Sequence, residues 1–396
     1  MRKLQRPMVI ATLLLVTCVS LMGALQPIAL ASSLIVDSDA GASKLVDAVQ
    51  SGSSPKPNLE ICAAPPTSGA GVTSIFEPNS PPAREIRDLS YLVLGICLAI
   101  FIVVQGFLVL AIVRGVKAAR TAKDNPTTTS SEPQQVYGSV PIEIAWTVIP
   151  VIVVFVLAMV TIRTIRDIDA TTPPEGALAV TVIGHQWWWE YRYTVDSGSA
   201  LAEQTTLVVT ANELHVPVGR PVSLRLESAD VIHSFWVPRL AGKTDLIPGH
   251  TNHLWFNAEQ AGLYLGQCAE YCGTQHAHML LRVYADEPAA FDAWLTAQAA
   301  PAVEDPLVAR GRAIFSEYAC LNCHTIAGTS AGMFGPNLTH LASRDTIGSG
   351  TVALTRASLR QWIDDPDVIK PSCNMPSLKL SADELDAITD YLMTLK

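Results

Sequence analysis

The chain has 396 residues, of which 49% are hydrophobic and 16% charged, and its formal net charge is −9 at neutral pH. This charged fraction is low, because about 25% of the residues are charged in a typical soluble protein. The acidic balance and the absence of a run of Lys or Arg argue against nucleic acid as a partner, since phosphate binding requires a basic face. The length predicts roughly two or three domains.

Residues 1–31 have the pattern of a secretory signal peptide. The basic start MRKLQR precedes an apolar run, and Ala29-Leu30-Ala31 offers small residues for cleavage. The apolar run from Met8 to Leu25 is longer than usual, so an uncleaved anchor stays open as an alternative. Residues 32–82 are rich in Ser, Pro, Gly and Ala, with few aromatic residues, and we predict a poorly ordered leader there.

Two uncharged segments within residues 83–170 predict a transmembrane hairpin. Residues 89–113 and 144–162 contain no charged side chain. Each segment is close to the length of about 20 apolar residues that a helix needs to cross a bilayer. Core helices of a soluble protein are the alternative. Cys97 lies in the first segment, where we expect it to be a small buried hydrophobic residue.

The loop between these two segments is basic. Its positive side chains are Arg114, Lys117, Arg120 and Lys123. By the positive-inside rule, this loop faces the cytoplasm and both long flanks face the exterior. Everything after Arg163 is therefore predicted to lie on the outer side of the membrane.

Short strands are predicted within residues 176–290. The segments 179–183, 206–209 and 222–226 alternate or run apolar, and Gly, Pro and Asn separate them. Short strands at this spacing predict an antiparallel sandwich or barrel of about 110 residues. Residues 291–306 then form a linker that contains Ala299-Ala300-Pro301.

The last segment, residues 307–396, has helical periodicity and predicts a small all-α domain. Ser381 and Glu384 have the spacing of a capping box at the start of the last helix. The segment also contains Cys320-Leu321-Asn322-Cys323-His324, and C-x-x-C-H is typical of covalent c-type haem attachment. A thiol redox pair is the alternative.

A haem held by His324 needs a second axial ligand, and Met/His ligation maintains a high reduction potential. Met375 is favoured, because it lies in a loop before the last helix, about fifty residues after His324. Met333 is too near the attachment turn to reach the opposite haem face. Met393 falls inside the last helix, where a packing role is expected.

Residues 268–279, CAEYCGTQHAHM, concentrate soft metal donors. The donors are Cys268, Cys272, His276 and Met279. A disulfide would leave the histidine and methionine without a role, and a zinc finger uses two separated pairs of N or S ligands. Thiolate, imidazole and thioether together suit copper. Coincidence stays open for this segment alone. His233 is the best candidate for a ligand from another strand, and a core histidine is the alternative.

Two resemblances extend these inferences. Residues 305–396 resemble class I cytochromes c through Cys320–His324, Gly335-Pro336-Asn337-Leu338 and Asn374-Met375-Pro376. Residues 80–290 resemble subunit II of a haem–copper cytochrome c oxidase. The motifs that carry the second resemblance are IEIAWT at 142–147, GHQWWW at 184–189, DVIHS at 230–234, GKTDLIPG at 242–249 and the cluster at 268–279. The combination is similar to caa3-type oxidases.

The resemblance implies a multidomain membrane protein. It consists of a transmembrane hairpin, an all-β cupredoxin domain (a Greek-key barrel) and an all-α cytochrome c domain. It also implies a binuclear copper centre, CuA, in which Cys268 and Cys272 bridge both ions. His233 and His276 each bind one copper, Met279 is a weak ligand, and Glu270 contributes its backbone carbonyl. In the last domain, Cys320 and Cys323 form haem thioethers, and His324 and Met375 are the axial ligands.

Three further roles come from the resemblance. Trp187 corresponds to the residue through which electrons reach CuA, although aromatic residues are also common in strands. The Glu270 side chain corresponds to a ligand of Mg²⁺ at the border with subunit I, which must supply the remaining ligands. Glu143 corresponds to a glutamate at the mouth of a proton path into subunit I. The alternative is that its carboxylate only interacts favourably with the positive end of the helix.

The function implied is that of the subunit at which electrons enter a bacterial terminal cytochrome c oxidase. A donor reduces haem c, and electrons pass through CuA to the haem a and haem–CuB groups of subunit I. There oxygen is reduced to water with proton pumping. The two spans of this chain contain no histidine, so we expect that this chain does not itself bind or reduce oxygen. The expected partners are subunit I, subunit III, the donor and the plasma membrane, with both redox domains on its outer face.

Two alternatives stay open for this function. A quinol oxidase subunit II would share the fold but lack the copper ligands. A membrane-anchored haem c and copper electron-transfer protein would function without an oxidase partner. The presence of Glu143 and Glu270, which matter only beside subunit I, favours the oxidase.

Overall fold

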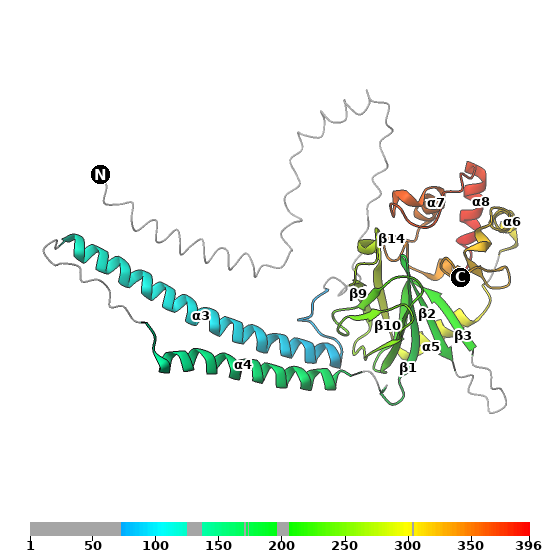
Figure 1. Cartoon of the computed structure of the whole chain (residues 1–396). Coiled ribbons are helices and arrows are strands. Elements are labelled where there is room, and N and C mark those ends of the chain that lie inside the picture. Colours follow the sequence, from blue (N-terminus) through cyan, green and yellow to red (C-terminus); the bar gives the residue numbers. More distant parts are fainter. Residues whose placement is uncertain (1–72, 125–136, 170–171, 173, 196–205, 303–304) are drawn as a thin grey trace, which may run out of the picture. The chain divides into compact units, whose positions relative to one another are not determined.

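The computed structural model describes residues 73–396, except for residues 125–136, 170–171, 173, 196–205 and 303–304. The described residues all belong to one compact unit of the chain, Ile61–Lys396. The predicted signal peptide, most of the predicted leader, Cys18 and Cys62 lie outside the described residues. The predicted fold class is confirmed: two apolar helices precede a domain of β-sheets and a helical domain (Figure 1).

Two long helices form the hairpin. They are α3 (Pro81–Asp124) and α4 (Val140–Asp167). Both are long and apolar enough to cross a membrane, and the most apolar window of each is not buried within the chain. Cys97 accordingly lies exposed on α3, so its expected burial is wrong. The apolar surface of this helix faces away from the rest of the described chain and is suited to lipid.

The start of α3 is attached to the β-sheet domain. The Asn79 backbone N–H donates to the carbonyl of Arg239 (2.8 Å), and the Asn79 side-chain oxygen accepts from the N–H groups of Glu259 and Gln260 (3.0 Å each). Asn79 is only 5% exposed. The helix therefore begins at a fixed point of the sheet domain.

The β domain consists of two mixed sheets of five strands. Their strand orders are β3-β2-β1-β5-β8 and β4-β10-β9-β6-β7, and the core lies between them. The strands are β1 (Leu178–His185), β2 (Trp188–Val195), β3 (Thr206–Ala211), β4 (Glu213–Pro217), β5 (Val222–Ser228), β6 (His233–Trp236), β7 (Thr244–Leu246), β8 (Asn252–Phe256), β9 (Gly262–Cys268) and β10 (Leu280–Asp286). The helix α5 (Pro288–Ala299) follows β10 and packs its buried Phe291 against the core.

Two strand pairs correct the antiparallel expectation. The pairs β1–β5 and β4–β10 are parallel, whereas the other pairs are antiparallel. After β3 the chain crosses to the second sheet for β4 and then returns to lie beside β1. Alternation of apolar residues identifies a strand and its inner face, but it carries no information about the direction of its neighbour.

The tryptophan run alternates as a strand requires. Trp189 is fully buried in the barrel core. Trp188 is on the opposite face of β2, yet it is only 8% exposed. It stacks on His185, with 4.1 Å between the ring centroids, and it lines a cavity of the C-terminal domain. Trp187 immediately precedes β2 and is half-buried.

The C-terminal domain is mainly helical. Its elements are η3 (Pro306–Val308), α6 (Ala309–Glu317), η4 (Cys320–Asn322), β11 (Thr325–Ile326), β12 (Ser330–Ala331), η5 (Leu341–Ser343), β13 (Thr346–Ile347), β14 (Val352–Ala353), α7 (Arg356–Asp364), η6 (Pro366–Val368) and α8 (Ala382–Leu392). Phe315 of α6 packs edge-on against Tyr391 of α8. The predicted capping box is confirmed, since Ser381 accepts from the Glu384 N–H and Glu384 accepts from the Ser381 N–H.

Candidate metal and haem centres

The segment 268–279 forms a closed loop at one end of the barrel. Cys268 ends β9, and the loop contains the short helix η2 (His276–His278) before β10 begins. The Cys268 N–H donates to the carbonyl of Met279 (2.9 Å), so the first and last donors of the loop are paired through their backbones. This closure brings residues eleven positions apart to one place.

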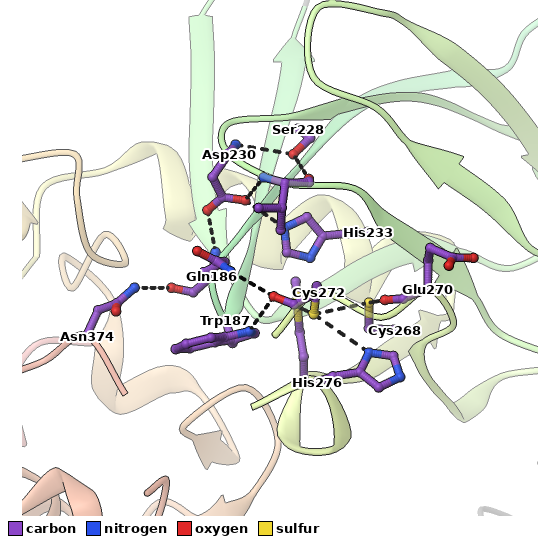
Figure 2. Close-up of polar contacts among 12 residues, drawn as sticks. Gln186, Trp187, Ser228, Asp230, His233, Cys268, Glu270, Cys272, His276 and Asn374 are labelled. Carbon is purple, nitrogen blue, oxygen red and sulfur yellow. Dashed lines mark hydrogen bonds and ion pairs between the residues drawn. The ribbon is translucent and has the colours of Figure 1, made fainter. Parts of the chain in front are cut away.

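The sulfur atoms of the loop converge (Figure 2). The Sγ atoms of Cys268 and Cys272 are 3.7 Å apart, far beyond the about 2.0 Å of a disulfide bond. The Cys272 Sγ also lies 3.7 Å from His276 Nδ1 and 3.9 Å from Met279 Sδ. The Glu270 carbonyl oxygen is 3.2 Å from Cys268 Sγ. The loop thus presents two thiols, an imidazole, a thioether and a carbonyl to one point.

Strand β6, which is the neighbour of β9 on the side opposite β10, supplies His233. This residue begins β6, which pairs with β9 through Phe235 and Cys268. His233, Cys268 and Cys272 each offer a ligand atom within 4.8 Å of the others. His233 Nε2 contacts Asp230 Oδ1 (2.8 Å), and the buried Nδ1 has no nitrogen or oxygen partner among the residues that the structure describes. The nitrogen left over is therefore the one available to a metal.

Electrostatics favour a thiolate in this cluster. The contact between the two sulfurs lowers the pKa of Cys268 and raises that of Cys272, so Cys268 is the thiol that ionises first. Burial would raise the pKa of Asp230, but hydrogen bonds from His233 and from the N–H groups of Val231 and Gln186 outweigh it and lower that pKa. The unpartnered His233 nitrogen, the thiolate and the thioether fit a soft metal ion such as copper better than a hard cation.

The Glu270 side chain points away from the sulfur cluster (Figure 2). Its carboxylate is 3.7 Å from Lys243 Nζ and is 44% exposed. One exposed carboxylate provides too few oxygen ligands to hold Mg²⁺. The predicted magnesium role therefore stays a prediction.

A cavity of about 610 Å³ is lined mainly by the C-terminal domain and in part by Gln186, Trp187, Trp188 and Asn212 of the β domain. Its lining includes Cys320, Cys323, His324 and Met375. Cys320 lies on the single turn η4, and the His324 N–H donates to the Cys320 carbonyl (3.0 Å), so both thiols and the imidazole belong to one turn. The volume is within the range of about 300–1,000 Å³ for cofactor sites.

His324 is oriented for ligation. Its Nδ1 contacts the carbonyl oxygen of Pro336 (2.9 Å), which fixes that nitrogen as the donor and leaves Nε2 free for a metal. Burial lowers the pKa of His324, which favours the neutral, ligating imidazole. A Cβ on Gly335 would lie 2.5 Å from His324 Cε1, so the GPNL segment needs glycine at this position. The cavity and its donors fit a covalently attached haem.

The methionine candidates are now separated in space. Met375 lines the cavity, whereas Met333 is 75% exposed. Met393 ends the last helix and is not among the residues that line the cavity. The loop position of Met375 therefore supports its predicted role as the second axial ligand.

Trp187 touches both candidate centres. Its indole N–H donates to the Cys272 carbonyl (2.9 Å), and the Gln186 side-chain amide donates to the same oxygen (2.8 Å). Trp187 also lines the haem cavity. Gly273 allows this approach, because it adopts a φ of +118° and a Cβ there would lie 2.9 Å from the Trp187 ring.

Glu143 lies in the first turn of α4 and is exposed. Its carboxylate accepts the Ser139 N–H (3.2 Å) at the start of the helix. The contact with Ser139 therefore matches the alternative role, in which the carboxylate stabilises the N-terminus of the helix. The proton-path role of Glu143 stays a prediction.

Some site residues escaped the sequence inferences. Asp230 orients His233, and the three-residue spacing within DVIH could have indicated it. Gln186, which supports the Cys272 carbonyl, lies beside Trp187 in the GHQWWW motif but has no distinctive pattern. His278 is half-buried, and its carbonyl accepts from the Thr351 hydroxyl of the C-terminal domain.

Comparisons with known proteins agree with this arrangement. The chain matches the families described as "Cytochrome C oxidase subunit II, transmembrane domain" over residues 72–164, "Cytochrome C oxidase subunit II, periplasmic domain" over residues 178–285, and "Cytochrome c" over residues 308–396.

Two relatives are named "Cytochrome c oxidase subunit 2". The protein of Alkalihalophilus pseudofirmus is 35% identical over 331 residues, which covers 81% of this chain and 90% of the relative. That of Bacillus sp. strain PS3 is 33% identical over 285 residues, covering 67% of this chain and 77% of the relative. The solved periplasmic domain of subunit II of cytochrome oxidase from Bradyrhizobium japonicum is 32% identical and covers 32% of this chain and 95% of its own, with a TM-score of 0.27. The chain belongs to the cytochrome c oxidase subunit II family and carries a cytochrome c domain at its C-terminal end.

Proposed function

We propose that this chain is the subunit at which electrons enter a bacterial terminal cytochrome c oxidase. The family implies a CuA centre in the β domain and haem c in the C-terminal domain. The chain accepts electrons from a donor at its haem domain and delivers them through its copper domain to subunit I. The observation that carries this proposal is the position of Trp187, which lines the haem cavity and donates a hydrogen bond to Cys272.

The proposed copper ligands are Cys268, Cys272, His233, His276, Met279 and the Glu270 carbonyl. The proposed haem ligands are Cys320 and Cys323 for the thioethers, and His324 and Met375 for the iron. When bound, these groups supply one-electron redox chemistry that the side chains themselves cannot perform. The convergence of each donor set on one point supports both assignments.

The protein's contribution is rigidity and exclusion of water. Cys268, Cys272, Met279 and His233 are each at most 2% exposed. His233 and Cys268 belong to strands β6 and β9, and the Met279 carbonyl accepts from the Cys268 N–H. The Cys272 carbonyl accepts from the side chains of Gln186 and Trp187. A ligand set fixed in this way changes little when an electron arrives or leaves, and a small reorganisation favours fast transfer at a small driving force.

The arrangement in the membrane is part of the proposal. α3 and α4 cross the bacterial plasma membrane twice, and the two redox domains lie on its outer face. Subunit I reduces oxygen to water with proton pumping, and subunit III completes the complex. Glu270 borders subunit I, where it contributes to a Mg²⁺ site, and Glu143 lies at a proton path. The basic end of α3 and the periplasmic family match support this orientation.

Affinity purification of the tagged full-length chain from its membrane tests this function. We expect copurification of a subunit containing haem a, together with one covalent haem c and three copper ions per complex, two bound by this chain and one, CuB, by subunit I. Copper and haem c without any haem a subunit would instead favour the alternative, an electron-transfer protein that has no oxidase partner. Absence of copper would contradict the proposal.

A further inference from the structure

We propose that Glu213 of the β domain and Lys370 of the C-terminal domain are positioning residues that hold the haem-binding domain in one fixed contact with the copper-binding domain. In this arrangement Trp187 stays against the haem cavity throughout turnover. The inference rests on the proposed function only for its kinetic test, because the contacts involve protein atoms alone.

Glu213 forms the first contact. It begins β4 and is 3% exposed, although it is charged. Its carboxylate accepts three hydrogen bonds from the C-terminal domain: from the Asp345 N–H (3.1 Å), the Thr346 N–H (2.9 Å) and the Thr346 hydroxyl (2.6 Å). A buried carboxylate is tolerated only when donors satisfy it, and here all three donors come from the other domain. Separation of the two domains would leave these groups without their partners.

Lys370 forms the second contact, in which the C-terminal domain supplies the buried side chain and the β domain supplies the backbone acceptor. It is 3% exposed, and its Nζ donates to the backbone carbonyl of Trp187 (2.8 Å). Burial lowers the pKa of Lys370 to about 7. Four residues later, Asn374 donates to the Gln186 carbonyl (2.9 Å; Figure 2). The loop that contains Met375 is thereby tied to the peptide beside Trp187.

Leu280 of the β domain and Ser349 of the C-terminal domain form a third contact. The Leu280 N–H donates to the Ser349 carbonyl (3.1 Å), and the Ser349 hydroxyl donates to the Leu280 carbonyl (3.2 Å). Gly350 allows this approach, because its φ is +80° and a Cβ there would lie 3.2 Å from the Leu280 Cβ. Leu280 directly follows the proposed copper ligand Met279. A covalent linker alone would raise the local concentration of the haem domain but would not produce reciprocal buried bonds of this kind.

The test measures the distance between the domains in the intact oxidase. Genetically encoded spin labels replace the exposed Thr194 in β2 and Asp383 in α8, and pulsed dipolar spectroscopy is performed on the fully reduced enzyme. We expect one narrow distance distribution. The double variant Glu213→Ala/Lys370→Met should broaden it, whereas Glu227→Gln/Lys379→Met, which removes the same charges elsewhere on the two domains, should not.

The kinetic readout separates positioning from a merely structural role. Electron transfer from haem c to CuA should be insensitive to added glycerol in the unaltered enzyme. In Glu213→Ala/Lys370→Met it should be at least tenfold slower and should slow further with viscosity, with unchanged copper and haem content. If the double variant loses copper or haem, the variant Thr346→Val replaces it in the test. This substitution removes only the hydroxyl donor to Glu213 and should also broaden the distance distribution.

Several outcomes would overturn the inference. One is a broad distance distribution in the unaltered enzyme with both centres loaded. Another is a distribution that stays equally narrow in the variants. A purified chain without copper or haem c would contradict the proposed function instead, so the two failures are distinguishable.

Discussion

At the scale of single residues, the copper cluster depends on which atoms are already engaged. Asp230 binds one nitrogen of His233, and the other has no nitrogen or oxygen partner within the part of the chain that the structure describes. The Cys268 and Cys272 sulfurs lie 3.7 Å apart without forming a disulfide bond. Both features leave donor atoms that are available to a metal ion. The sequence spacing identified the donors and could have indicated Asp230, but it could not predict which nitrogen of His233 Asp230 engages, because tautomers are set by contacts in space.

Replacement of Cys272 by serine should abolish the binuclear centre. A serine hydroxyl is a poor bridging ligand for copper, so copper should fall from about two ions per chain to one or none. Haem c should be retained, because its donors lie in another domain. Metal analysis and EPR spectroscopy of the purified chain measure both quantities. Cys97→Ser, on the exposed surface of α3, is the matched control and should keep the full copper content.

Replacement of Gly335 by alanine should disturb the haem ligand without touching a donor atom. The new Cβ would lie 2.5 Å from the His324 ring, so the imidazole must move from its position against Pro336. We expect weaker iron ligation, measured as loss of the low-spin haem c spectrum. Gly95→Ala, where no atom lies within 4 Å, should leave the spectrum unchanged. A normal low-spin spectrum in Gly335→Ala would show that the ring position is not constrained in this way.

At the scale of secondary-structure elements, local sequence patterns predicted which residues form strands and a helix cap, but not the direction or the pairing of the strands. The strands at 179–183, 206–209 and 222–226 and the capping box at Ser381 follow from short-range patterns, and the structure has them. The parallel pairing of β1 with β5 depends on a crossover between sheets, which no local pattern encodes. The same limit applies to Trp188, since alternation places it on the face of β2 opposite Trp189 but does not show that another domain covers it.

Loss of the cap of α8 should weaken the haem domain. Ser381→Ala removes the acceptor of the Glu384 N–H and should cost about 1 kcal/mol of unfolding free energy. Denaturant unfolding of the full chain, followed through the haem c absorbance, measures the change. Ser316→Ala removes a hydroxyl that bonds only within the exposed face of α6 and should cost less. Equal losses in both variants would contradict the capping explanation.

The same cap predicts a dependence on pH. Hydrogen bonds from the Ser381 hydroxyl, the Ser381 N–H and Tyr318 lower the pKa of Glu384. A carboxyl with a lowered pKa stabilises the fold above its ordinary pKa of about 4.3, and this contribution disappears as the pH falls through the lower value. Glu384→Gln should therefore be less stable than the unaltered chain at pH 7, with a difference that shrinks below about pH 4. A difference that is constant from pH 7 to pH 3 would exclude this origin.

At the scale of the whole molecule, two redox domains and a membrane hairpin occur in one chain. Motifs predicted each domain separately, because each donor set is compact in the sequence or repeats a known spacing. The contact between the domains was not predictable, since Glu213, Lys370 and Ser349 are ordinary residues in their local segments. Their significance arises only where residues 69 to 183 positions apart meet.

The central claim is that electrons cross from the haem domain to the copper domain within one chain, by way of Trp187. Rapid photoreduction of haem c in the purified oxidase, with absorbance recorded for haem c and CuA, tests it most directly. We predict that haem c oxidation and CuA reduction share one first-order rate that does not depend on oxidase concentration. Trp187→Phe should lower this rate, whereas Trp188→Phe, which alters the same cavity without the bond to Cys272, should affect it less. A rate proportional to the oxidase concentration, or haem c oxidation without CuA reduction, would contradict the account.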